Sequence, residues 1–263
     1  MVESQLADAY HTAVLHSARR RIGVMFRPRL ESQFSAFFMS NGDRRFIVTA
    51  QHCVESLVPD EPLLLGTFAT PLAAQVDWSV RQHFPPRNQR DADAAAIEVD
   101  QEWAARQDVD WIDIKHVGSR GVRSGTQLLL AGFPIEKAAV VRGKSHGAAP
   151  FALFTKAATF PRGLQIEGMV PDRRVDIFVR FGATEFRDAA GKAIPRTEPH
   201  GMSGCPVFLV PPLPRGTVWS PHRLRLVGLQ SSLIRQAGLL VVKRIEHVDG
   251  LLSGPQSVNR GTA

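Results

Sequence analysis

From residue 22 onward the chain is a succession of short apolar segments rich in β-branched residues, separated by turn signals such as Asn41-Gly42-Asp43. The strand–helix–strand alternation that accompanies a parallel sheet is missing from this pattern. We therefore predict an all-β fold, a barrel or a sandwich. The expected strands form two series, the first over residues 22–26, 33–39, 45–50, 63–68, 74–80 and 94–99, and the second over residues 127–133, 140–142, 151–159, 164–169, 175–181, 207–210, 224–230 and 239–243.

The two series predict two barrels, joined near residues 105–125. Ahead of them, apolar residues such as Tyr10 and Val14 recur at helical spacing after Ser4, which is placed to cap an amphipathic helix. This helix can pack across a barrel or dock on a partner, and we favour packing. A closing helix is expected over residues 243–252. The expected organisation is an N-terminal helix (1–20), an N-terminal barrel (21–115), a C-terminal barrel (116–252) and a tail (253–263).

Composition excludes several classes of protein. With 263 residues, 44% of them hydrophobic and 22% charged, the chain can bury one large core or two small ones. It contains no run of 18 apolar residues, and residues 1–8 lack the basic start and apolar region of a secretory signal. Two cysteines do not make a disulfide framework. We therefore expect a cytoplasmic protein that does not act on membranes.

The net charge of +7 raises the question of nucleic-acid binding. The basic residues are mostly arginines scattered along the chain, for example at Arg19–Arg21, Arg173–Arg174 and Arg235. No basic stripe interleaved with aromatic residues accompanies them, as a nucleic-acid surface would ordinarily show. We expect no specific nucleic-acid partner, because such a composition more often reflects the coding bias of a genome.

The chain carries its strongest chemical signal in the hexapeptide Gly201-Met202-Ser203-Gly204-Cys205-Pro206, between two apolar segments. Its two glycines permit a sharp turn where a Cβ atom would clash. Such a turn can aim the N–H groups of Gly201 and Ser203 at one point beside the Ser203 hydroxyl. Backbone donors beside a nucleophile form an oxyanion hole, which is usually the largest electrostatic contribution to acyl transfer. Ser203 is therefore a candidate nucleophile.

Two upstream segments supply partners for a serine nucleophile. The expected strand 45–50 runs into His52, and a hydroxyl needs an adjacent base of this kind at neutral pH. Asp93 precedes a segment that alternates small or apolar residues with a charged one, and a buried carboxylate there would fix the tautomer of the histidine. Asp91, two residues earlier, is a rival for the same role. Taken singly, each residue also has a structural interpretation: a turn serine, a strand-end histidine bonded to backbone and a strand-capping aspartate.

On the segments Thr49–Cys53, Asp93–Ile97 and Gly201–Pro206, the chain resembles the trypsin-like serine peptidases of the chymotrypsin fold. The order His, Asp, Ser is that of this family, whereas subtilisin-like enzymes and α/β-hydrolases use other orders. The resemblance extends from about residue 21 to about residue 250. It implies two six-stranded antiparallel barrels with short terminal helices, and a serine endopeptidase with catalytic His52, Asp93 and Ser203 that needs no cofactor.

The chain departs from the family pattern at three places. Met202 stands where digestive members carry the aspartate that drives zymogen activation, so the resemblance points to the intracellular and bacterial type, such as the Deg-type and glutamyl endopeptidases. Cys205 replaces a glycine and can crowd the turn. The usual disulfide beside the histidine is missing, and Cys53 and Cys205 are interpreted as two small buried thiols. No paired Cys or His spacing predicts a metal site.

By the same resemblance, the substrate pocket lies between the nucleophile turn and the segment 227–232. This chain has no aspartate at the position that, in trypsin, selects basic side chains. Glu198 favours a basic or polar substrate residue if its carboxylate points inward, and His200 is expected to line the cleft. The candidate pocket residues are Thr197, Glu198, His200, Gln230, Ser231 and Ser232.

Two functions remain open at this stage. One is an endopeptidase that acts on a protein or peptide substrate and is controlled by a regulatory protein partner. The other is a weak or inactive binding protein on the same fold, in which crowding at Cys205 has removed catalysis.

Overall fold

The computed structural model describes most of the chain. The expected strands at 140–142 and 164–169, and residues 77–80 of the strand expected at 74–80, lie outside the described residues, as does the tail beyond Ser253. The described residues are 2–58, 61–67, 74–76, 82–83, 92–135, 138–139, 147–148, 150–161, 163, 170–181, 185–188, 192–212, 220 and 223–253.

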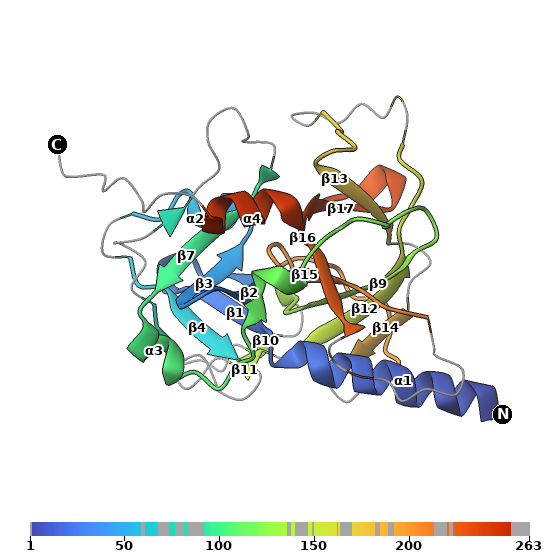
Figure 1. The fold of residues 1–263 in the computed structure, drawn as a ribbon, viewed down its shortest axis with the longest axis horizontal. Coiled ribbons are helices and arrows are strands. Elements are labelled where there is room, and N and C mark those ends of the chain that lie inside the picture. The colour runs from blue at the N-terminus through green and yellow to red at the C-terminus, as the bar shows by residue number, and fades with distance from the viewer. Residues whose placement is uncertain are drawn as a thin grey trace.

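The first half of the chain forms an antiparallel sheet in the strand order β5-β4-β1-β2-β3-β7-β6, with β8 added parallel to β2 (Figure 1). Its centre, β1 to β3, is a meander whose neighbouring strands pair in register over five or six residues. The strands are β1 (Ile22–Arg27), β2 (Ser32–Asn41), β3 (Arg44–Thr49), β4 (Leu64–Thr67), β5 (Ala74–Gln75), β6 (Gln82–His83), β7 (Ala95–Val99) and β8 (Ile112–Asp113).

The second half forms another antiparallel sheet, in the order β13-β17-β16-β15-β9-β12-β14, beside a two-stranded ribbon of β10 and β11. The described sheets hold eight and seven strands instead of six each. In the first sheet, the two-residue strands β5 and β6 lie at the edges, and the two-residue strand β8 pairs with the end of β2. The strands are β9 (Gln127–Gly132), β10 (Ala138–Ala139), β11 (Gly147–Ala148), β12 (Phe151–Lys156), β13 (Asp176–Arg180), β14 (Glu185–Asp188), β15 (Pro206–Leu209), β16 (Arg225–Ile234) and β17 (Leu239–Arg244).

Helices occupy both ends of the chain, as predicted, and two further helices interrupt the first half. The sequence analysis missed α3, although Asp100 caps it by accepting hydrogen bonds from the N–H groups of Glu102 and Trp103. Single-turn 3-10 helices cover Pro28–Leu30, Ile114–His116 and Arg235–Ala237. The α-helices are α1 (Val2–Arg19), α2 (Gln51–Val54), α3 (Gln101–Ala105) and α4 (Ile245–Ser253).

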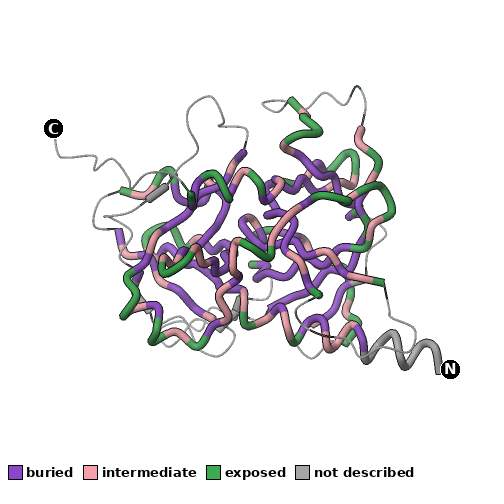
Figure 2. Tube along the Cα trace, in the orientation of Figure 1, coloured by how far each residue is buried: buried purple, intermediate pink, exposed green. Residues whose placement is uncertain are grey.

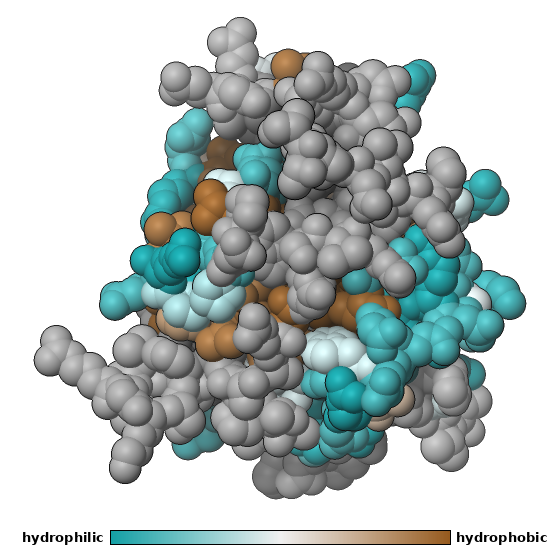
Figure 3. Space-filling view, turned by 90° about the vertical axis from the view of Figure 1, so that its left-hand side faces the viewer, coloured by the Kyte–Doolittle hydropathy of each residue, from teal (hydrophilic) through white to brown (hydrophobic). Residues whose placement is uncertain are grey.

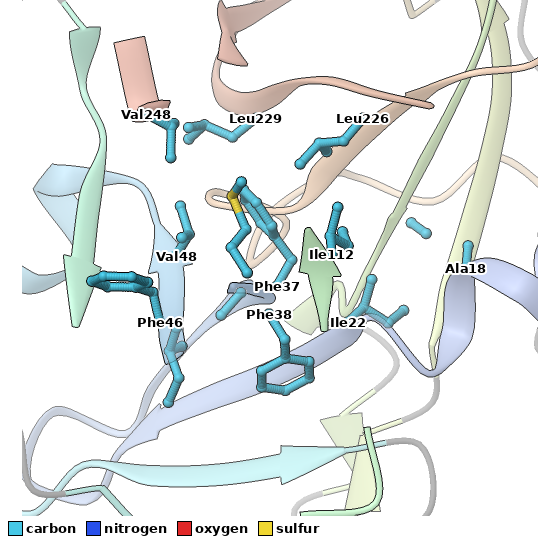
Figure 4. Close-up of a cluster of buried hydrophobic side chains, with 14 of the residues drawn as sticks. Ala18, Ile22, Phe37, Phe38, Phe46, Val48, Ile112, Leu226, Leu229 and Val248 are labelled. Carbon is cyan, nitrogen blue, oxygen red and sulfur yellow. The ribbon is translucent and has the colours of Figure 1, made fainter. Parts of the chain in front are cut away.

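The largest hydrophobic core is built from both halves of the chain. Figure 4 shows side chains of the first sheet, such as Phe37 and Phe46, packed toward Leu226 and Leu229 of β16 and Val248 of α4. Helix α1 joins the same core through buried Tyr10, Val14, Leu15 and Ala18, so its apolar face packs on the barrels as expected. A second cluster lies within the second sheet.

The strands run through the interior and the connections lie outside (Figure 2). On the face that carries the first sheet, hydrophilic residues cover much of the described surface, and apolar residues gather near its middle (Figure 3). The large hydrophobic residues exposed in the described part are separate in sequence: Leu30, Val58, Ile135 and Val170. None of the described helices is long and apolar enough to cross a membrane.

Candidate active site

His52 lies where the first sheet meets its short helix α2. Strand β3 ends at Thr49, and the extended Ala50 begins the helix, so the histidine follows a rigid strand directly. Its Nδ1 atom lies 2.9 Å from Asp93 Oδ2 and 3.0 Å from Asp93 Oδ1. The backbone N–H of His52 also donates to Asp93 Oδ1, at 3.1 Å. These contacts to one carboxylate fix both the position of the ring and its orientation.

Asp93 approaches the histidine from the segment just before β7. Its φ angle of 38° is in the left-handed region, which aspartate tolerates better than most residues. Its carboxylate also accepts a hydrogen bond from the Ser231 hydroxyl of β16. Ser231 was expected only as a pocket residue, and its bond to Asp93 was not foreseen. The rival Asp91 lies outside the described residues.

The contact between His52 and Asp93 changes the proton affinity of both groups. The hydrogen bond to Asp93, followed by the neighbouring Cys53 thiol, raises the pKa of His52 to about 10. Burial acts to raise the pKa of Asp93, but the hydrogen bond and charge of His52 outweigh it, and the net shift is downward. The pair therefore favours imidazolium beside carboxylate.

Ser203 faces the same pocket as His52 from a tight turn. The N–H of Met202 donates to the carbonyl of Pro199 at 3.0 Å, and Gly201 has a φ angle of 86°, as the third residue of a type II turn requires. The Ser203 hydroxyl donates to the carbonyl of Ser231 at 3.3 Å. No hydrogen bond joins it to His52 in the described structure, although both side chains belong to the lining of one pocket.

Two backbone donors beside Ser203 have no partner within the described protein: the N–H groups of Gly201 and of Ser203. The carbonyl of His200 accepts a hydrogen bond from the N–H of Ile135 at 2.7 Å. Because C=O and N–H point in opposite directions across a trans peptide, this bond turns the Gly201 N–H away from Ile135. A Cβ atom on Gly201 would lie 2.8 Å from Ile135 Cγ1, so only glycine fits there.

Cys205 does not crowd the turn. Its side chain is fully buried against Gly132 of β9, and a Cβ atom on that glycine would come within 2.8 Å of Cys205 Cβ. The extra volume is therefore accommodated by a glycine on the neighbouring strand. Burial strongly raises the pKa of the Cys205 thiol. Both cysteines are buried and free, and Met202 is also buried, in the second apolar cluster.

A pocket of about 430 Å³ adjoins Ser203. Four of the six expected pocket residues line it, whereas Thr197 is buried and is not part of the lining. Glu198 is also outside the lining, and Arg235 Nη1 binds its carboxylate at 2.9 Å. The expectation that the Glu198 carboxylate faces the pocket is therefore not met: Glu198 pairs with Arg235, and Arg235 is the residue of this pair that lines the pocket. The lining residues are His52, Pro199, His200, Ser203, Gln230, Ser231, Ser232, Leu233 and Arg235.

Sequence reasoning overlooked Ser35 and Ile135, both of which contact the nucleophile turn. Ser35 interrupts the apolar run of β2, and that interruption was the only available signal. Ile135 gave no signal at all, since it acts through its backbone. Among the described residues, no group of three His, Cys, Asp or Glu side chains is arranged to hold a metal ion.

Comparisons with known proteins identify the fold. Neither a protein-family model nor a curated protein matches the sequence. Among solved structures, Deg5 superposes with a TM-score of 0.55 at 12% identity, over 95% of this chain and 98% of Deg5. Human heparin binding protein gives 0.56 at 14% identity (91% and 94% covered), and a Glu endopeptidase gives 0.53 at 11% identity (90% and 92% covered).

The chain therefore has the chymotrypsin fold: two antiparallel sheets with short terminal helices, as the sequence predicted. Structures that share this fold include a Glu endopeptidase as well as a protein named for binding heparin. At these identities the likeness defines the fold and leaves the activity to be argued from the site.

Proposed function

We propose that this protein is a serine endopeptidase of the trypsin-like class, of the type that lacks the zymogen-activation aspartate. The observation that carries the proposal is the arrangement of three side chains. His52 Nδ1 is held 2.9 Å from Asp93, and Ser203 opens into the same pocket beside two unpartnered backbone N–H groups. This arrangement supplies a base, an orienting carboxylate, a nucleophile and an oxyanion hole.

The proposed reaction begins with a rotation of the Ser203 hydroxyl from the carbonyl of Ser231 toward Nε2 of His52. Ser203 Oγ then attacks the peptide carbonyl while His52 accepts its proton, and Asp93 stabilises the imidazolium. The N–H groups of Gly201 and Ser203 bind the oxyanion. His52 returns the proton to the leaving amine, and water releases the acyl group by the same steps.

The proposal is tested by labelling with a fluorescent fluorophosphonate. We expect the wild type to be labelled, and we expect Ser203→Ala and His52→Ala to lose the label while both remain folded by circular dichroism. Ser232→Ala is the matched control, because its hydroxyl lines the same pocket and has no role in the proposed chemistry. Labelling that persists in Ser203→Ala would contradict the assignment of the nucleophile.

The second candidate function is a catalytically inactive binding protein on the same fold. The observation that favours it is the hydrogen bond from Ser203 to the Ser231 carbonyl, which leaves the hydroxyl without its base. Human heparin binding protein shares the fold at a TM-score of 0.56. Folded wild-type protein that resists fluorophosphonate would support this candidate over the endopeptidase.

We also propose that a protein partner controls the endopeptidase, by promoting the rotation of Ser203 toward His52. The isolated chain should then cleave fluorescein-labelled casein slowly. Rapid cleavage of casein by the isolated protein would contradict control by a partner, while still supporting the endopeptidase.

A further inference from the structure

Ser35 is a buried serine of β2 whose side chain touches the nucleophile turn. It is fully buried, between Phe34 and Ala36 on an otherwise apolar stretch. Its Oγ accepts a hydrogen bond from the N–H of Phe133 at 2.9 Å and donates one to the carbonyl of Gly201 at 3.0 Å. A hydroxyl at such a position costs free energy unless both hydrogen bonds are made, and here both are.

The backbone of Ser35 holds the other end of the same turn. Its N–H donates to the carbonyl of Ser203 at 3.0 Å, and its own carbonyl accepts from Thr49 Oγ1 at 2.8 Å. Any residue but proline at position 35 could make the backbone bonds, whereas the bond to Gly201 needs a side-chain donor such as the hydroxyl. One residue of the first sheet therefore contacts both residues that carry the unpartnered N–H groups.

Gly201 is the part of the turn that most needs such support. A glycine moves between backbone conformations at little cost, so the two peptides that flank it can rotate unless they are anchored. The preceding peptide is anchored by the bond from Ile135 to the His200 carbonyl. The following peptide is held within the turn by the bond from Met202 N–H to the Pro199 carbonyl, and to the first sheet by the Ser35 hydroxyl. In the described structure, Ser35 Oγ is the hydrogen-bond donor to the Gly201 carbonyl.

The anchors belong to one network that starts on β2. Gln33 and Ser35 are two residues apart, so their side chains lie on the same face of the strand. Gln33 Nε2 donates to the carbonyl of Phe133 at 2.8 Å, and Ser35 Oγ accepts from its N–H. Both the N–H and the carbonyl of Phe133 are therefore held by β2. Two residues later in the same segment, the N–H of Ile135 binds the His200 carbonyl.

We propose that the Ser35 hydroxyl is a positioning group that aims the Gly201 N–H at the oxyanion. This inference rests on the proposed peptidase function. Without the hydroxyl, the Gly201–Met202 peptide keeps its bond to Pro199 within the turn but loses its side-chain bond to the first sheet. The turn is then held less firmly against that sheet, and the Gly201 N–H is aimed at the oxyanion less of the time. Deleting a whole oxyanion donor costs roughly a hundred- to a thousandfold in rate, and a misaimed donor should cost less.

The test compares Ser35→Ala with Ser119→Ala. Ser119 is also a buried serine whose hydroxyl joins a donor, Arg244, to an acceptor, Glu246, and it lies beside α4. We expect Ser35→Ala to slow phosphorylation of Ser203 by diisopropyl fluorophosphate by about ten- to a hundredfold. Ser119→Ala should react at the wild-type rate even if its thermal stability falls equally.

A second readout separates positioning from general loosening of the structure. The phosphorus NMR shift of the diisopropylphosphoryl adduct depends on hydrogen bonding to the phosphoryl oxygen. We expect the shift in Ser35→Ala to move toward that of the unfolded adduct, and the shift in Ser119→Ala to stay at the wild-type value. Unchanged rate and shift in folded Ser35→Ala would overturn the inference.

Ser35→Cys, assayed with reductant, keeps the test decisive if the alanine variant does not fold. The thiol nearly preserves the volume but is a weaker donor, so an intermediate rate is expected. A wild-type rate in Ser35→Cys, with no change of the phosphorus shift, would refute the inference on its own. A wild type that does not react at all would instead refute the proposed peptidase function.

Discussion

At the scale of single residues, the proton affinity of His52 sets how the proposed reaction responds to pH. Only the neutral imidazole can accept the Ser203 proton. The hydrogen bond to Asp93 stabilises the protonated form and raises the pKa of His52 to about 10. The resting pair is therefore mostly charged at neutral pH.

We expect the rate of fluorophosphonate labelling to rise with pH from neutral into the alkaline range, with a midpoint well above the ordinary histidine value of 6.5. In an NMR titration of the His52 ring, Asp93→Asn should lower the midpoint toward 6.5, because it removes the main cause of the shift. A wild-type midpoint at or below 6.5 would contradict this account.

Gly204 is the residue of the turn that tolerates a side chain least. It has a φ angle of 86°, and a Cβ atom there would lie 2.2 Å from Thr49 Oγ1 and 2.4 Å from the carbonyl of Ser35. The turn is thus packed directly on the first sheet. This close approach explains why the hexapeptide needs its second glycine.

We expect Gly204→Ala to lower the free energy of unfolding by more than about 4 kcal/mol, measured by urea denaturation. Gly42→Ala is the matched control, since Gly42 has a φ angle of 60° but a Cβ atom added to it would meet no other atom within 4 Å. That substitution should cost only about 1–2 kcal/mol, for the left-handed conformation alone. Equal losses in the two variants would show that packing does not matter at Gly204.

At the scale of elements, the end of β16 and the turn after it determine the charge of the pocket. Arg235 belongs to the pocket lining, and its partner Glu198 lies outside it. Among the described residues that line the pocket, His52 and His200 are the other ionisable groups, and none is a carboxylate. The pocket should therefore favour an acidic substrate side chain over a basic one.

We expect the wild type to cleave peptides that place Glu in the pocket faster than matched peptides that place Gln there. Arg235→Gln should reduce this preference for Glu about tenfold. Glu198→Gln should increase the preference for Glu, because Arg235 then has no carboxylate partner on the protein at position 198 and can bind the acidic substrate side chain. Mass spectrometry of a digested peptide library measures all three preferences. A preference for basic residues in the wild type would contradict the prediction.

At the scale of the whole molecule, α4 joins the end of the chain to its first half. Arg44 and Asn41 donate side-chain hydrogen bonds to the carbonyl of Leu252, and Val248 is buried in the core shared by both sheets (Figures 1 and 4). The sequence alone suggested a helix at this place and did not reveal what it packs against. Because one core contains side chains from α4, β16 and the first sheet, the two halves should unfold together.

We expect Val248→Asp to lower the free energy of unfolding by at least about 3 kcal/mol, because it buries an unpaired charge. Hydrogen exchange should become faster in β3 and β7 of the first sheet as well as in β16. Gly250→Asp, on the exposed side of the same helix, is the control and should change stability little, because an added Cβ atom there would meet no other atom within 4 Å. Loss of protection confined to the second sheet would refute the coupling of the two halves.

Local signals in the amino-acid sequence were enough to predict an all-β fold, most of the described strands and the candidate residues His52 and Ser203. The resemblance to trypsin-like peptidases favoured Asp93 over its rival Asp91. Alternating β-branched segments and glycine turns are signals of this local kind. Other features depend on packing between distant segments, and only the folded chain reveals them. Gly132 makes room for Cys205, Arg235 neutralises Glu198, and Ser35 reaches Gly201 across the barrel interface. These contacts join residues far apart in the chain, so no local pattern could predict them.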